Sequence, residues 1–353
     1  MRILAINPGS TSTKIAVYEN ENRLFVTTFY HSPEALSHFP TILSQYDYRK
    51  ELIIDELKKE NLFSDFDAIV GRGGLLKPIA SGVYEVNEVM KNDLRNATMQ
   101  HACNLGGLLA EDIALLIPGC KAYIADPVVV DELDDVARLS GSPLMMRKSV
   151  FHALNHKAIA RKYARSVNKK YEELDLIVAH LGGGISVAAH RQGRVIDVNN
   201  ALEGSGPFSP ERAGTLPARQ LVDLCFSGDY TQEEIKKMIT GRGGLMAHLG
   251  TTDAQNVVKR INEGDARAEL VLKSMIYNIA KEFGSMSVVL HGKIDAILLT
   301  GGISYNDYCI NKLKEYIAFI APVYVFPGED EMEALAFNAL GVLRGKLNCK
   351  EYY

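Results

Sequence analysis

A cluster of hydroxyl side chains follows the first apolar run of the chain. After Ile3–Ile6 the sequence reads Asn-Pro-Gly-Ser-Thr-Ser-Thr-Lys at positions 7–14. A strand that runs into a glycine, small hydroxyl residues and a lysine is typical of a turn whose backbone N–H groups and side-chain donors converge on an anion, most often a phosphate. The sequence therefore suggests an anion site, most often one for a phosphate, in the turn within residues 7–14.

Two further glycine-rich turns follow apolar strands. A triple glycine at 182–184 comes directly after strand 176–179, His180 and Leu181, and a pair of glycines at 301–302 comes after strand 296–300. The turn at 9–14 has the lysine of a P-loop but lacks its second glycine, and no predicted strand is followed by the Gly-x-Gly-x-x-Gly fingerprint. Glycines at the end of a strand let a ribose or a flat ring approach the backbone, so the turn at 301–302 is a candidate adenosine site. Taken alone, a tight strand-to-helix turn explains it better.

Charged side chains stand where predicted strands end. Arg72 and Arg242 share the context Gly-Arg-Gly-Gly-Leu, but only Arg72 leaves the carboxyl end of a strand, where ligands of open α/β sheets gather. Asp126 follows strand 121–124 in the same way. Arg212 lies in a Gly/Pro-rich stretch that is typical of a site loop, although an ordinary surface arginine is the alternative.

The histidines suggest hydrogen-bond donors rather than a metal centre. His152 and His156 have the spacing of a zinc helix, but the glutamate that a metalloprotease carries after the first histidine is missing. His180 ends a strand directly before the triple glycine, and His101 starts a helix. Both are candidates for side chains that face a cleft.

The elements that position these residues alternate between short strands and amphipathic helices, which predicts an α/β fold. Stretches 3–24 and 176–198 both read as strand, glycine turn, strand and polar turn. Two such hairpins favour a duplicated α/β domain with both turns facing one cleft, whereas glycine-turn hairpins in an unrelated mixed sheet are the alternative. We place the division between the halves near residues 147–150.

Composition narrows the class of protein. The 353 residues are 47% hydrophobic, which is globular composition, and carry a formal charge of −4. This mild charge argues against a nucleic-acid or membrane-surface protein, since those usually carry a basic face, and a local basic patch is the alternative. Five scattered cysteines contain no Cys-x-x-Cys pair and suit a reducing compartment. No apolar run is long enough for a membrane span. We therefore expect a cytoplasmic protein with neither nucleic-acid nor membrane partners.

Four segments together resemble the acetate and butyrate kinases: residues 7–14, 150–156, 179–184 and 299–303, in the family's order along essentially the whole chain. That family belongs to the actin-like, sugar-kinase-like superfamily. The resemblance implies two duplicated ribonuclease-H-like domains around a nucleotide cleft, with the last helix returning to the first domain. It therefore implies an N-terminal domain of 1–149 plus 331–353, and a C-terminal domain of 150–330 that binds nucleotide.

The resemblance also implies roles for individual residues. Those near the transferred phosphate would be Asn7, Ser10, Ser12 and Lys14. Those that hold ATP would be His180, Gly182, Gly183, Gly184, Gly301, Gly302 and Ile303. Those around the acyl carboxylate would be Arg72 and Arg212, with Asp126 as the catalytic aspartate and His101 and His152 as further active-site residues. Glu331 would lie near Mg²⁺, in a stretch that also holds Glu329, Asp330 and Glu333.

Two departures from acetate kinases concern the acyl pocket. Gly74 replaces a valine and Ala201 replaces a proline, while Phe151 is kept. Losing two bulky walls would leave room for a longer acyl chain, and each buried methylene contributes about 0.8 kcal/mol. The Gly-Arg-Gly-Gly-Leu form resembles the butyrate kinases of the family.

The expected activity is reversible transfer of the ATP γ-phosphoryl group to butanoate, with ATP or ADP and Mg²⁺ as cofactors. Two alternatives stay open: a kinase of another short or branched acid, such as acetate, propionate or isobutyrate, and a non-catalytic actin-like ATP-binding module. Dimers or larger assemblies are usual in the family, so a homodimer or higher homo-oligomer is expected.

Overall fold

The computed structural model describes residues 1–97 and 100–353, which form two compact units. Unit 1 comprises Met1–Val130 and Asp330–Tyr353, and unit 2 comprises Asp131–Glu329. The sequence analysis placed the division near residue 149. Residues 131–148 pack instead within unit 2, because the Asp134 N–H donates to the Ile196 carbonyl at 3.0 Å and Arg147 pairs with Asp197 at 2.7 Å.

Unit 1 is built on a seven-stranded sheet of order β12-β5-β6-β4-β1-β2-β3. Its strands are β1 (Arg2–Pro8), β2 (Ser12–Glu19), β3 (Asn22–Tyr30), β4 (Ala68–Arg72), β5 (Val83–Glu85), β6 (Lys121–Ala125) and β12 (Cys349–Lys350). Strands β1, β4 and β6 run parallel, and β1–β2–β3 form antiparallel hairpins.

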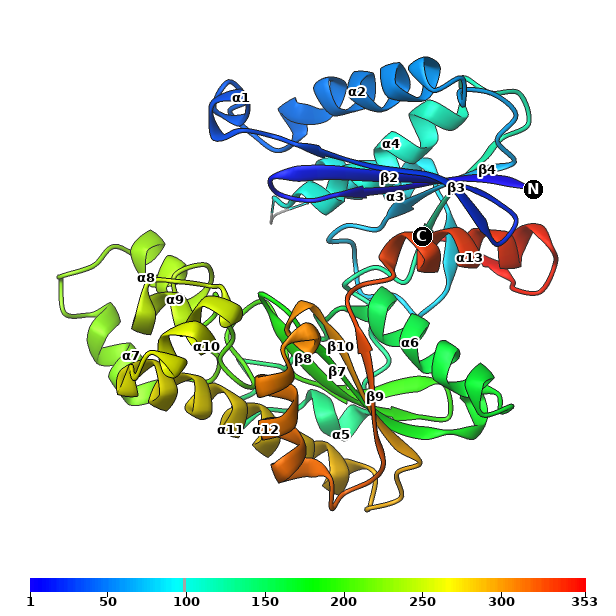
Figure 1. Ribbon diagram of the computed structural model, residues 1–353. Coiled ribbons are helices and arrows are strands. Elements are labelled where there is room, and N and C mark those ends of the chain that lie inside the picture. Colours follow the sequence, from blue (N-terminus) through cyan, green and yellow to red (C-terminus); the bar gives the residue numbers. More distant parts are fainter. Residues whose placement is uncertain (98–99) are drawn as a thin grey trace. The chain divides into compact units, whose positions relative to one another are not determined.

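Helices cover both faces of this sheet. They are α1 (Pro33–Ser37), α2 (Tyr46–Lys59), α3 (Glu88–Arg95), α4 (Leu105–Ala114) and α13 (Glu331–Leu343), with 3-10 helices η1 (Leu43–Gln45) and η2 (Ala102–Asn104). Figure 1 shows α2 and α4 on one face and α13 on the other. Side chains alternate between the two faces along a strand. Leu4 and Ile6 of β1 face the core beneath α2 and α4. Tyr18 of β2 lies on the opposite face, where its ring meets Phe337 of α13 edge-on at 6.3 Å.

Unit 2 is built on a five-stranded sheet of order β11-β10-β7-β8-β9. Its strands are β7 (Asp175–Leu181), β8 (Ile185–Arg191), β9 (Arg194–Val198), β10 (Ala296–Gly301) and β11 (Val323–Pro327). Its helices are α5 (Asp135–Arg138), α6 (Ala153–Ser166), η3 (Tyr171–Glu173), α7 (Ala218–Cys225), α8 (Gln232–Ile239), α9 (Gly244–Leu249), α10 (Ala254–Asn262), α11 (Ala266–Val289), η4 (Gly302–Tyr305) and α12 (Asp307–Ile317).

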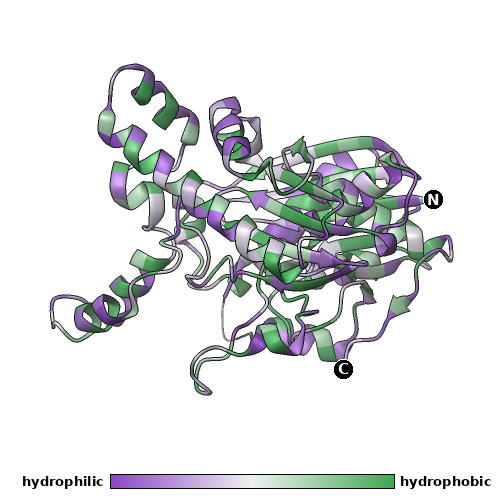
Figure 2. Ribbon diagram, turned by 90° about the horizontal axis from the view of Figure 1, so that it is seen from below, coloured by the Kyte–Doolittle hydropathy of each residue, from purple (hydrophilic) through white to green (hydrophobic). Residues whose placement is uncertain are grey.

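Unit 2 has a hydrophobic cluster on each face of its sheet, and successive residues of a strand contribute to the two clusters in turn. Leu176 and Val178 pack with α6, whereas Ile177 and Ala179 pack with α11 on the opposite face. Hydrophobic residues accordingly run through the strands, while most helices show hydrophobic and hydrophilic residues in turn (Figure 2). Strands β7, β8 and β10 are therefore buried on both faces, as is typical where helices cover both faces of a sheet.

The two units repeat one strand plan. Order β3-β2-β1-β4-β6 in unit 1 corresponds to β9-β8-β7-β10-β11 in unit 2, with the same parallel and antiparallel pairings. Even the register shifts correspond, at Val17/Tyr18 and at Ala189/His190. The prediction of an α/β fold with a duplicated domain is confirmed.

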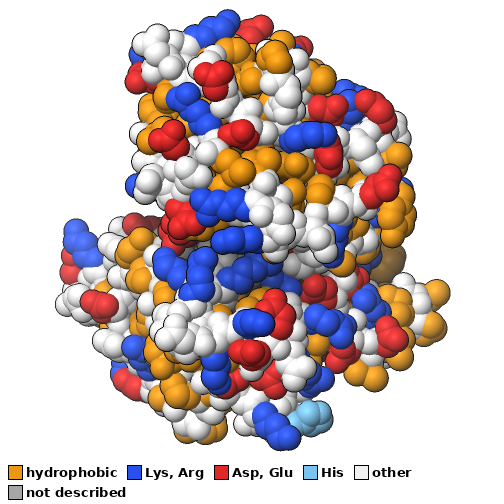
Figure 3. All heavy atoms as spheres, turned by 90° about the vertical axis from the view of Figure 1, so that its right-hand side faces the viewer, with side chains coloured by type: hydrophobic (Ala, Val, Ile, Leu, Met, Phe, Trp, Pro, Cys, Tyr) orange, Lys and Arg blue, Asp and Glu red, His pale blue; other side chains and the backbone are white. Residues whose placement is uncertain are grey.

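The exterior of each unit carries charged side chains of both signs, as the face in Figure 3 shows. Within residues 1–97 and 100–353, none of the helices combines the length and the apolar character that crossing a bilayer requires.

Candidate functional site

In unit 1, three predicted site residues leave neighbouring parallel strands at the same edge of the sheet. The register pairs Ile6 of β1 with Gly71 of β4, and Arg72 of β4 with Ala125 of β6. Asn7, Arg72 and Asp126 therefore follow one another across the carboxyl ends of β1, β4 and β6. This is the edge where ligands of open α/β sheets bind.

A charged cluster forms where α13 begins. Arg72 Nη1 lies 3.0 Å from Glu331 Oε2 and 3.4 Å from Asn7 Oδ1, and Asn7 Nδ2 donates to Glu331 Oε2 at 2.5 Å. Glu331 is buried, and the Arg72 side chain is 21% exposed. Three residues separated by up to 324 positions in the sequence are thus held in one charge-assisted network.

The four acidic residues around 329–333 differ in their surroundings. Glu331 bonds Arg72 and Asn7 in unit 1, whereas Glu329 ends unit 2 and lies 3.1 Å from His180. Asp330 is the N-cap residue of α13, and Glu333 lies in its first turn. Glu331 is therefore the acidic residue that the Arg72 cluster holds.

Asp126 makes its contacts with a neighbouring turn. It is buried, with φ of +39°, and its Oδ1 accepts from Ser81 Oγ at 2.6 Å and from Gly82 N–H at 2.8 Å. Aspartate tolerates this left-handed conformation better than most residues. The structure places Asp126 at the predicted edge and anchors its carboxylate to the Ser81–Gly82 turn.

An arginine that the sequence analysis did not single out makes hydrogen bonds to the hydroxyl-rich turn between β1 and β2. Arg49 of α2 is fully buried and donates to the carbonyls of Gly9, Ser10 and Ser12 at 2.9 to 3.4 Å. The cross-strand register places Lys14 of β2 opposite Asn7 of β1, on the same face of the sheet. The predicted phosphate donors are thus grouped around one turn.

His101 and Gly74 lie near the ends of α4 and β4. His101 caps η2, where its Nδ1 accepts from the Cys103 N–H at 3.2 Å. A Cβ added at Gly74 would lie 2.5 Å from the Cα and Oδ1 of Asn104 and 2.9 Å from Leu94 Cδ2. The room expected from the missing side chain at Gly74 is therefore not open, because Asn104 and Leu94 fill it.

In unit 2, Arg212 packs directly against the triple glycine turn between β7 and β8, so a residue of this turn must lack a side chain. A Cβ on Gly184 would overlap Nη1 of Arg212, which donates to the Ala201 carbonyl. The same turn is tied to its neighbouring loop by Ser209 Oγ, which donates to the Gly183 carbonyl at 2.5 Å. Glycine at 184 is thus required by the packing of Arg212 against the turn.

Arg212 itself lacks a carboxylate partner within the described residues. Its Nε is buried without a hydrogen-bond acceptor, and burial lowers the pKa of the guanidinium while Glu211 opposes this shift. A partly buried cation whose buried Nε donor is unsatisfied is costly unless an anion completes it. This arrangement suits a site for an anionic ligand.

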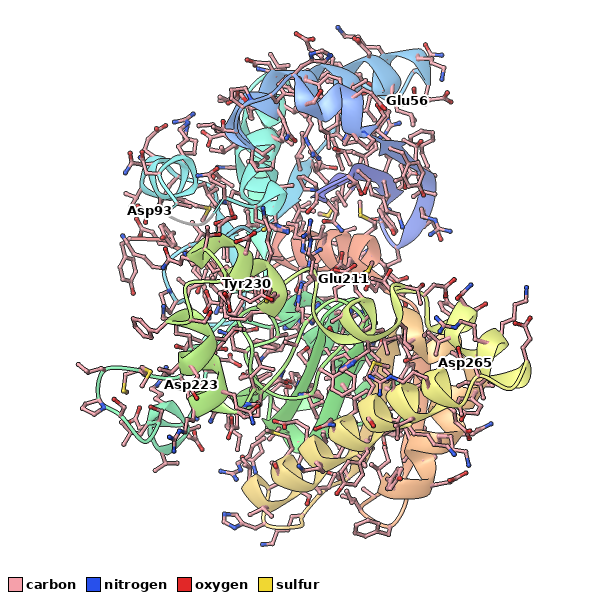
Figure 4. All side chains as sticks on the ribbon, turned by 90° about the vertical axis from the view of Figure 1, so that its left-hand side faces the viewer. Glu56, Asp93, Glu211, Asp223, Tyr230 and Asp265 are labelled. Carbon is pink, nitrogen blue, oxygen red and sulfur yellow. The ribbon has the colours of Figure 1, made fainter. Side chains whose placement is uncertain are left out.

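A cavity of about 450 Å³ opens beside this turn. Its lining combines two of the predicted glycine motifs with residues that the sequence analysis missed: Gly182, Gly183, Pro210, Glu211, Thr252, Asp253, Ala254, Gln255, Gly302, Ile303 and Asn306. Glu211, labelled in Figure 4, comes from the loop between β9 and α7. Asp253 caps α10 by accepting from Gln255 N–H at 2.8 Å, a capping signal that the sequence contained.

Two predicted histidines stack in unit 2. The rings of His152 and His180 are 3.8 Å apart and nearly parallel. His180 Nδ1 lies 3.1 Å from Asn155 Oδ1, and its Nε2 lies 3.1 Å from Glu329 Oε1. Asn155 and Glu329 thus fix the ring orientation of His180.

Behind His152 runs a buried hydrogen-bond chain. It links His152 Nδ1 to Ser186 Oγ (2.9 Å), Ser186 Oγ to His156 Nε2 (2.8 Å), His156 Nδ1 to His190 Nε2 (3.3 Å) and His190 Nδ1 to the Tyr171 hydroxyl (2.6 Å). Burial lowers the pKa of His156 and His190 well below the usual value, so both are neutral. Each of these two neutral rings donates from one nitrogen and accepts at the other, so the bonds from His156 through His190 to Tyr171 all run in one direction.

Phe151 and Ala201, the other predicted pocket residues, are connected to the same region. Phe151 is buried and meets the His156 ring edge-on at 5.2 Å. Ala201 is also buried, and its N–H donates to the Val150 carbonyl at 2.9 Å. The structure therefore brings Phe151 and Ala201 onto adjacent backbone segments of unit 2.

A family model and full-length relatives both match this sequence, and both are carboxylate kinases by their descriptions. The sequence model described as the acetokinase family matches residues 136–319. A probable butyrate kinase of Bacteroides thetaiotaomicron is 60% identical over 352 residues, covering 100% of both chains. Butyrate kinase 1 of Clostridium acetobutylicum is 53% identical, covering 99% of both.

Solved structures agree in fold. An acetate kinase of Porphyromonas gingivalis matches with a TM-score of 0.79 at 19% identity, covering 97% of this chain and 99% of that one. A propionate kinase of Francisella tularensis matches with a TM-score of 0.75 at 18% identity, covering 96% of this chain and 98% of that one.

Proposed function

Because the chain belongs to the acetokinase family, we propose that it transfers the γ-phosphoryl group of ATP reversibly to butanoate, giving butanoyl phosphate and ADP. Full-length relatives named butyrate kinases support butanoate as the acceptor. The observation that carries the proposal is the Arg72 cluster at the carboxyl edge of the unit 1 sheet. It supplies a guanidinium for a carboxylate beside a turn rich in phosphate donors.

The acceptor determines what the protein must provide. A short carboxylic acid has a pKa near the value of about 4.3 for glutamate, so it is already ionised at neutral pH and needs no general base. Two anions must nevertheless meet, and the loose transition state spreads negative charge over the equatorial oxygens of the phosphoryl group. In this proposal Arg72 and Lys14 of unit 1 and Arg212 and His180 of unit 2 stabilise this charge electrostatically. His152 stacks on the His180 ring, whose orientation Asn155 and Glu329 fix.

The nucleotide belongs to unit 2 in this proposal. The cavity lined by Gly182, Gly183, Gly302 and Ile303 accommodates adenosine and leaves the backbone of the triple glycine for the phosphates. Gly301 shapes the turn, with a φ of +92° that favours glycine. In unit 1, Asn7, Ser10, Ser12 and Lys14 donate to the transferred phosphoryl group.

We propose that one carboxylate, that of Glu331, would help to hold the Mg²⁺ ion of the reaction. Mg²⁺ is usually held by one or two carboxylates together with substrate phosphates, and the described residues contain no cluster of three or more acidic, histidine or cysteine ligands. Glu331 suits such a role, because its Oε2 is held by Arg72 and Asn7. When bound, the ion neutralises phosphate charge. We assign Asp126 an orienting role, through the turn that it anchors, rather than that of a base.

In unit 2 we propose Phe151 and Ala201 as residues for the acyl chain, and in unit 1 we propose His101 and Gly74. Since Asn104 and Leu94 fill the space beside Gly74, the preference for a longer acid rests on Ala201 and on the named relatives. We further propose a cytoplasmic location, supported by five free cysteines, and a homodimer or larger homo-oligomer, which sedimentation would measure.

A series of acids tests the substrate class. The pure protein is incubated with MgATP, hydroxylamine and straight or branched acids from acetate to hexanoate, and acyl phosphate is trapped as hydroxamate. We expect product to be greatest with butanoate. A maximum at acetate or isobutyrate would keep the carboxylate kinase and overturn butanoate, and no product with any acid would favour a non-catalytic ATP-binding module.

A further inference from the structure

The turn between β1 and β2 contains donors that face outward. The N–H groups of Ser10 and Thr11 have no acceptor among the described residues, and both residues are exposed. Their peptide units are those whose carbonyls belong to Gly9 and Ser10. The C=O and N–H of a trans peptide point in opposite directions, so fixing these two carbonyls also fixes where the two N–H groups point.

The guanidinium of Arg49 holds both carbonyls by hydrogen bonds. Its Nη1 donates to Gly9 O at 3.0 Å and its Nη2 to Ser10 O at 3.4 Å. The guanidinium is itself held by Gln45, whose Oε1 accepts from Nε at 3.1 Å and from Nη2 at 2.8 Å. The planar fork of arginine suits this task because it spans several acceptors at once, which a lysine ammonium does not.

The charge of Arg49 has no counter-ion. Its partners in the part of the chain that the structure describes are main-chain carbonyls, Gln45 and the Thr13 hydroxyl, and none of the ion pairs includes it. His31, which lies 2.9 Å from the same hydroxyl, is neutral, since burial and then Arg49 lower its pKa to about 4. A fully buried cation among neutral groups is costly unless an anion compensates it.

We propose that Arg49 is a positioning residue for phosphoryl transfer: it turns the 9–12 segment into an anion cradle by aiming the N–H groups of Ser10 and Thr11 at the transferred phosphoryl group. This rests on the proposed function for the identity of the anion. The buried charge adds a favourable potential at the cradle without touching the ligand.

Variants of Arg49 separate this role from a merely structural one. Arg49→Met removes the charge and the fork, and Arg49→Lys keeps the charge but loses the fork. Leu57→Ala is the matched control, because Leu57 is buried on the same helix, α2, and contacts the core rather than the turn. All variants are assayed below their own unfolding temperatures, with kcat and KM measured for butanoate and for MgATP.

We expect Arg49→Met to lower kcat by about 100-fold, the usual loss for one preorganised donor, with little change in the KM for MgATP. Arg49→Lys should fall between Arg49→Met and the wild type, and Leu57→Ala should keep the wild-type kcat. If Arg49→Met does not fold, Arg49→Lys decides the question. A folded Arg49 variant with the kcat of Leu57→Ala would overturn the proposal.

A second readout does not depend on turnover. Hydrogen exchange of residues 7–14 is measured by mass spectrometry with inorganic phosphate or with chloride at matched ionic strength. Phosphate should slow exchange in this segment of the wild type and of Leu57→Ala but not of the Arg49 variants. Equal protection in the Arg49 variants would refute the cradle, whereas a protected wild type that phosphorylates no acid would refute only the proposed function.

Discussion

At the scale of single residues, close packing makes Gly184 a sensitive position. Arg212 Nη1 lies where a Cβ on residue 184 would be, and Arg212 is the cation of unit 2 with a buried, unsatisfied Nε. The glycine therefore lets a guanidinium sit directly against the backbone of the turn proposed for the ATP phosphates. A methyl group there must displace the arginine, because the neighbouring Ala201 carbonyl lies only 3.2 Å from the same point.

Gly184→Ala is accordingly expected to lower kcat by about 100-fold, as for the loss of one preorganised charge, while the fold persists. The matched control is Gly141→Ala, since nothing lies within 4 Å of a Cβ added at Gly141. Steady-state kinetics and thermal unfolding measure both effects. Wild-type kcat in Gly184→Ala would mean that the position of Arg212 is not important for the reaction.

At the scale of elements, the turn from β10 into η4 serves two separate purposes. Gly301 has a φ of +92°, and a Cβ there would lie 2.5 Å from the Leu181 carbonyl oxygen, so the residue holds β10 beside β7. Gly302 lines the cavity, and nothing lies within 4 Å of a Cβ added there. Of these two adjacent glycines, Gly301 is required by the backbone conformation and close packing, whereas Gly302 is the one that lines the cavity.

This predicts opposite outcomes for two neighbouring alanine substitutions. Gly301→Ala should lower the free energy of unfolding by about 2 kcal/mol or more, from positive φ and overpacking. Gly302→Ala should stay within about 0.5 kcal/mol of the wild type but raise the KM for ATP. Urea unfolding and kinetics of both variants decide the matter; a stable Gly301→Ala would remove the packing argument.

Elements also show how much the sequence alone could predict. Apolar residues recur at helical spacing over residues 232–239, which is the observed range of α8, and the predicted strand ends put Asn7 and Arg72 at one edge of the sheet. The helical pattern of residues 155–171 corresponds to α6, which begins at Ala153 and ends at Ser166, because Asn168 adopts a left-handed conformation with a φ of +54°. Strands β5 and β12 are too short, at 3 and 2 residues, to give a pattern.

The missed site residues share a physical cause. Arg49 lies in an ordinary amphipathic helix, and its contacts with the 9–12 segment arise only when α2 packs on the sheet. The contribution of 252–255 to the cavity likewise depends on where α10 lies in unit 2. Nor did the glycine at 74 reveal that Asn104 would occupy the space beside it. Tertiary packing decides each of these features.

At the scale of the whole molecule, buried neutral histidines couple stability to pH. Burial lowers the pKa of His156 and His190 well below 6.5 in unit 2, and burial together with Arg49 lowers the pKa of His31 to about 4 in unit 1. Unfolded histidines titrate near pH ~6.5. Below that pH the unfolded chain binds more protons than the native state, so the native state loses stability.

We therefore expect the free energy of unfolding to fall from pH ~6.5 towards pH ~4, with a slope of at most about 1.4 kcal/mol per pH unit for each histidine. Urea unfolding monitored by circular dichroism measures this slope. His156→Gln should reduce it, whereas His38→Gln, at an exposed position, should not. Constant stability across this range would contradict the neutral, buried state of these histidines.

The central claim is that ATP phosphorylates a carboxylate through the cations of both units, and ³¹P NMR of the wild type with MgATP and butanoate tests it most directly. We predict that the γ-phosphoryl resonance is replaced by that of an acyl phosphate with equal formation of ADP, and that Arg72→Ala slows this by orders of magnitude while nucleotide still stabilises the variant against unfolding. ATP loss that is independent of butanoate, or wild-type rates in Arg72→Ala, would contradict the account.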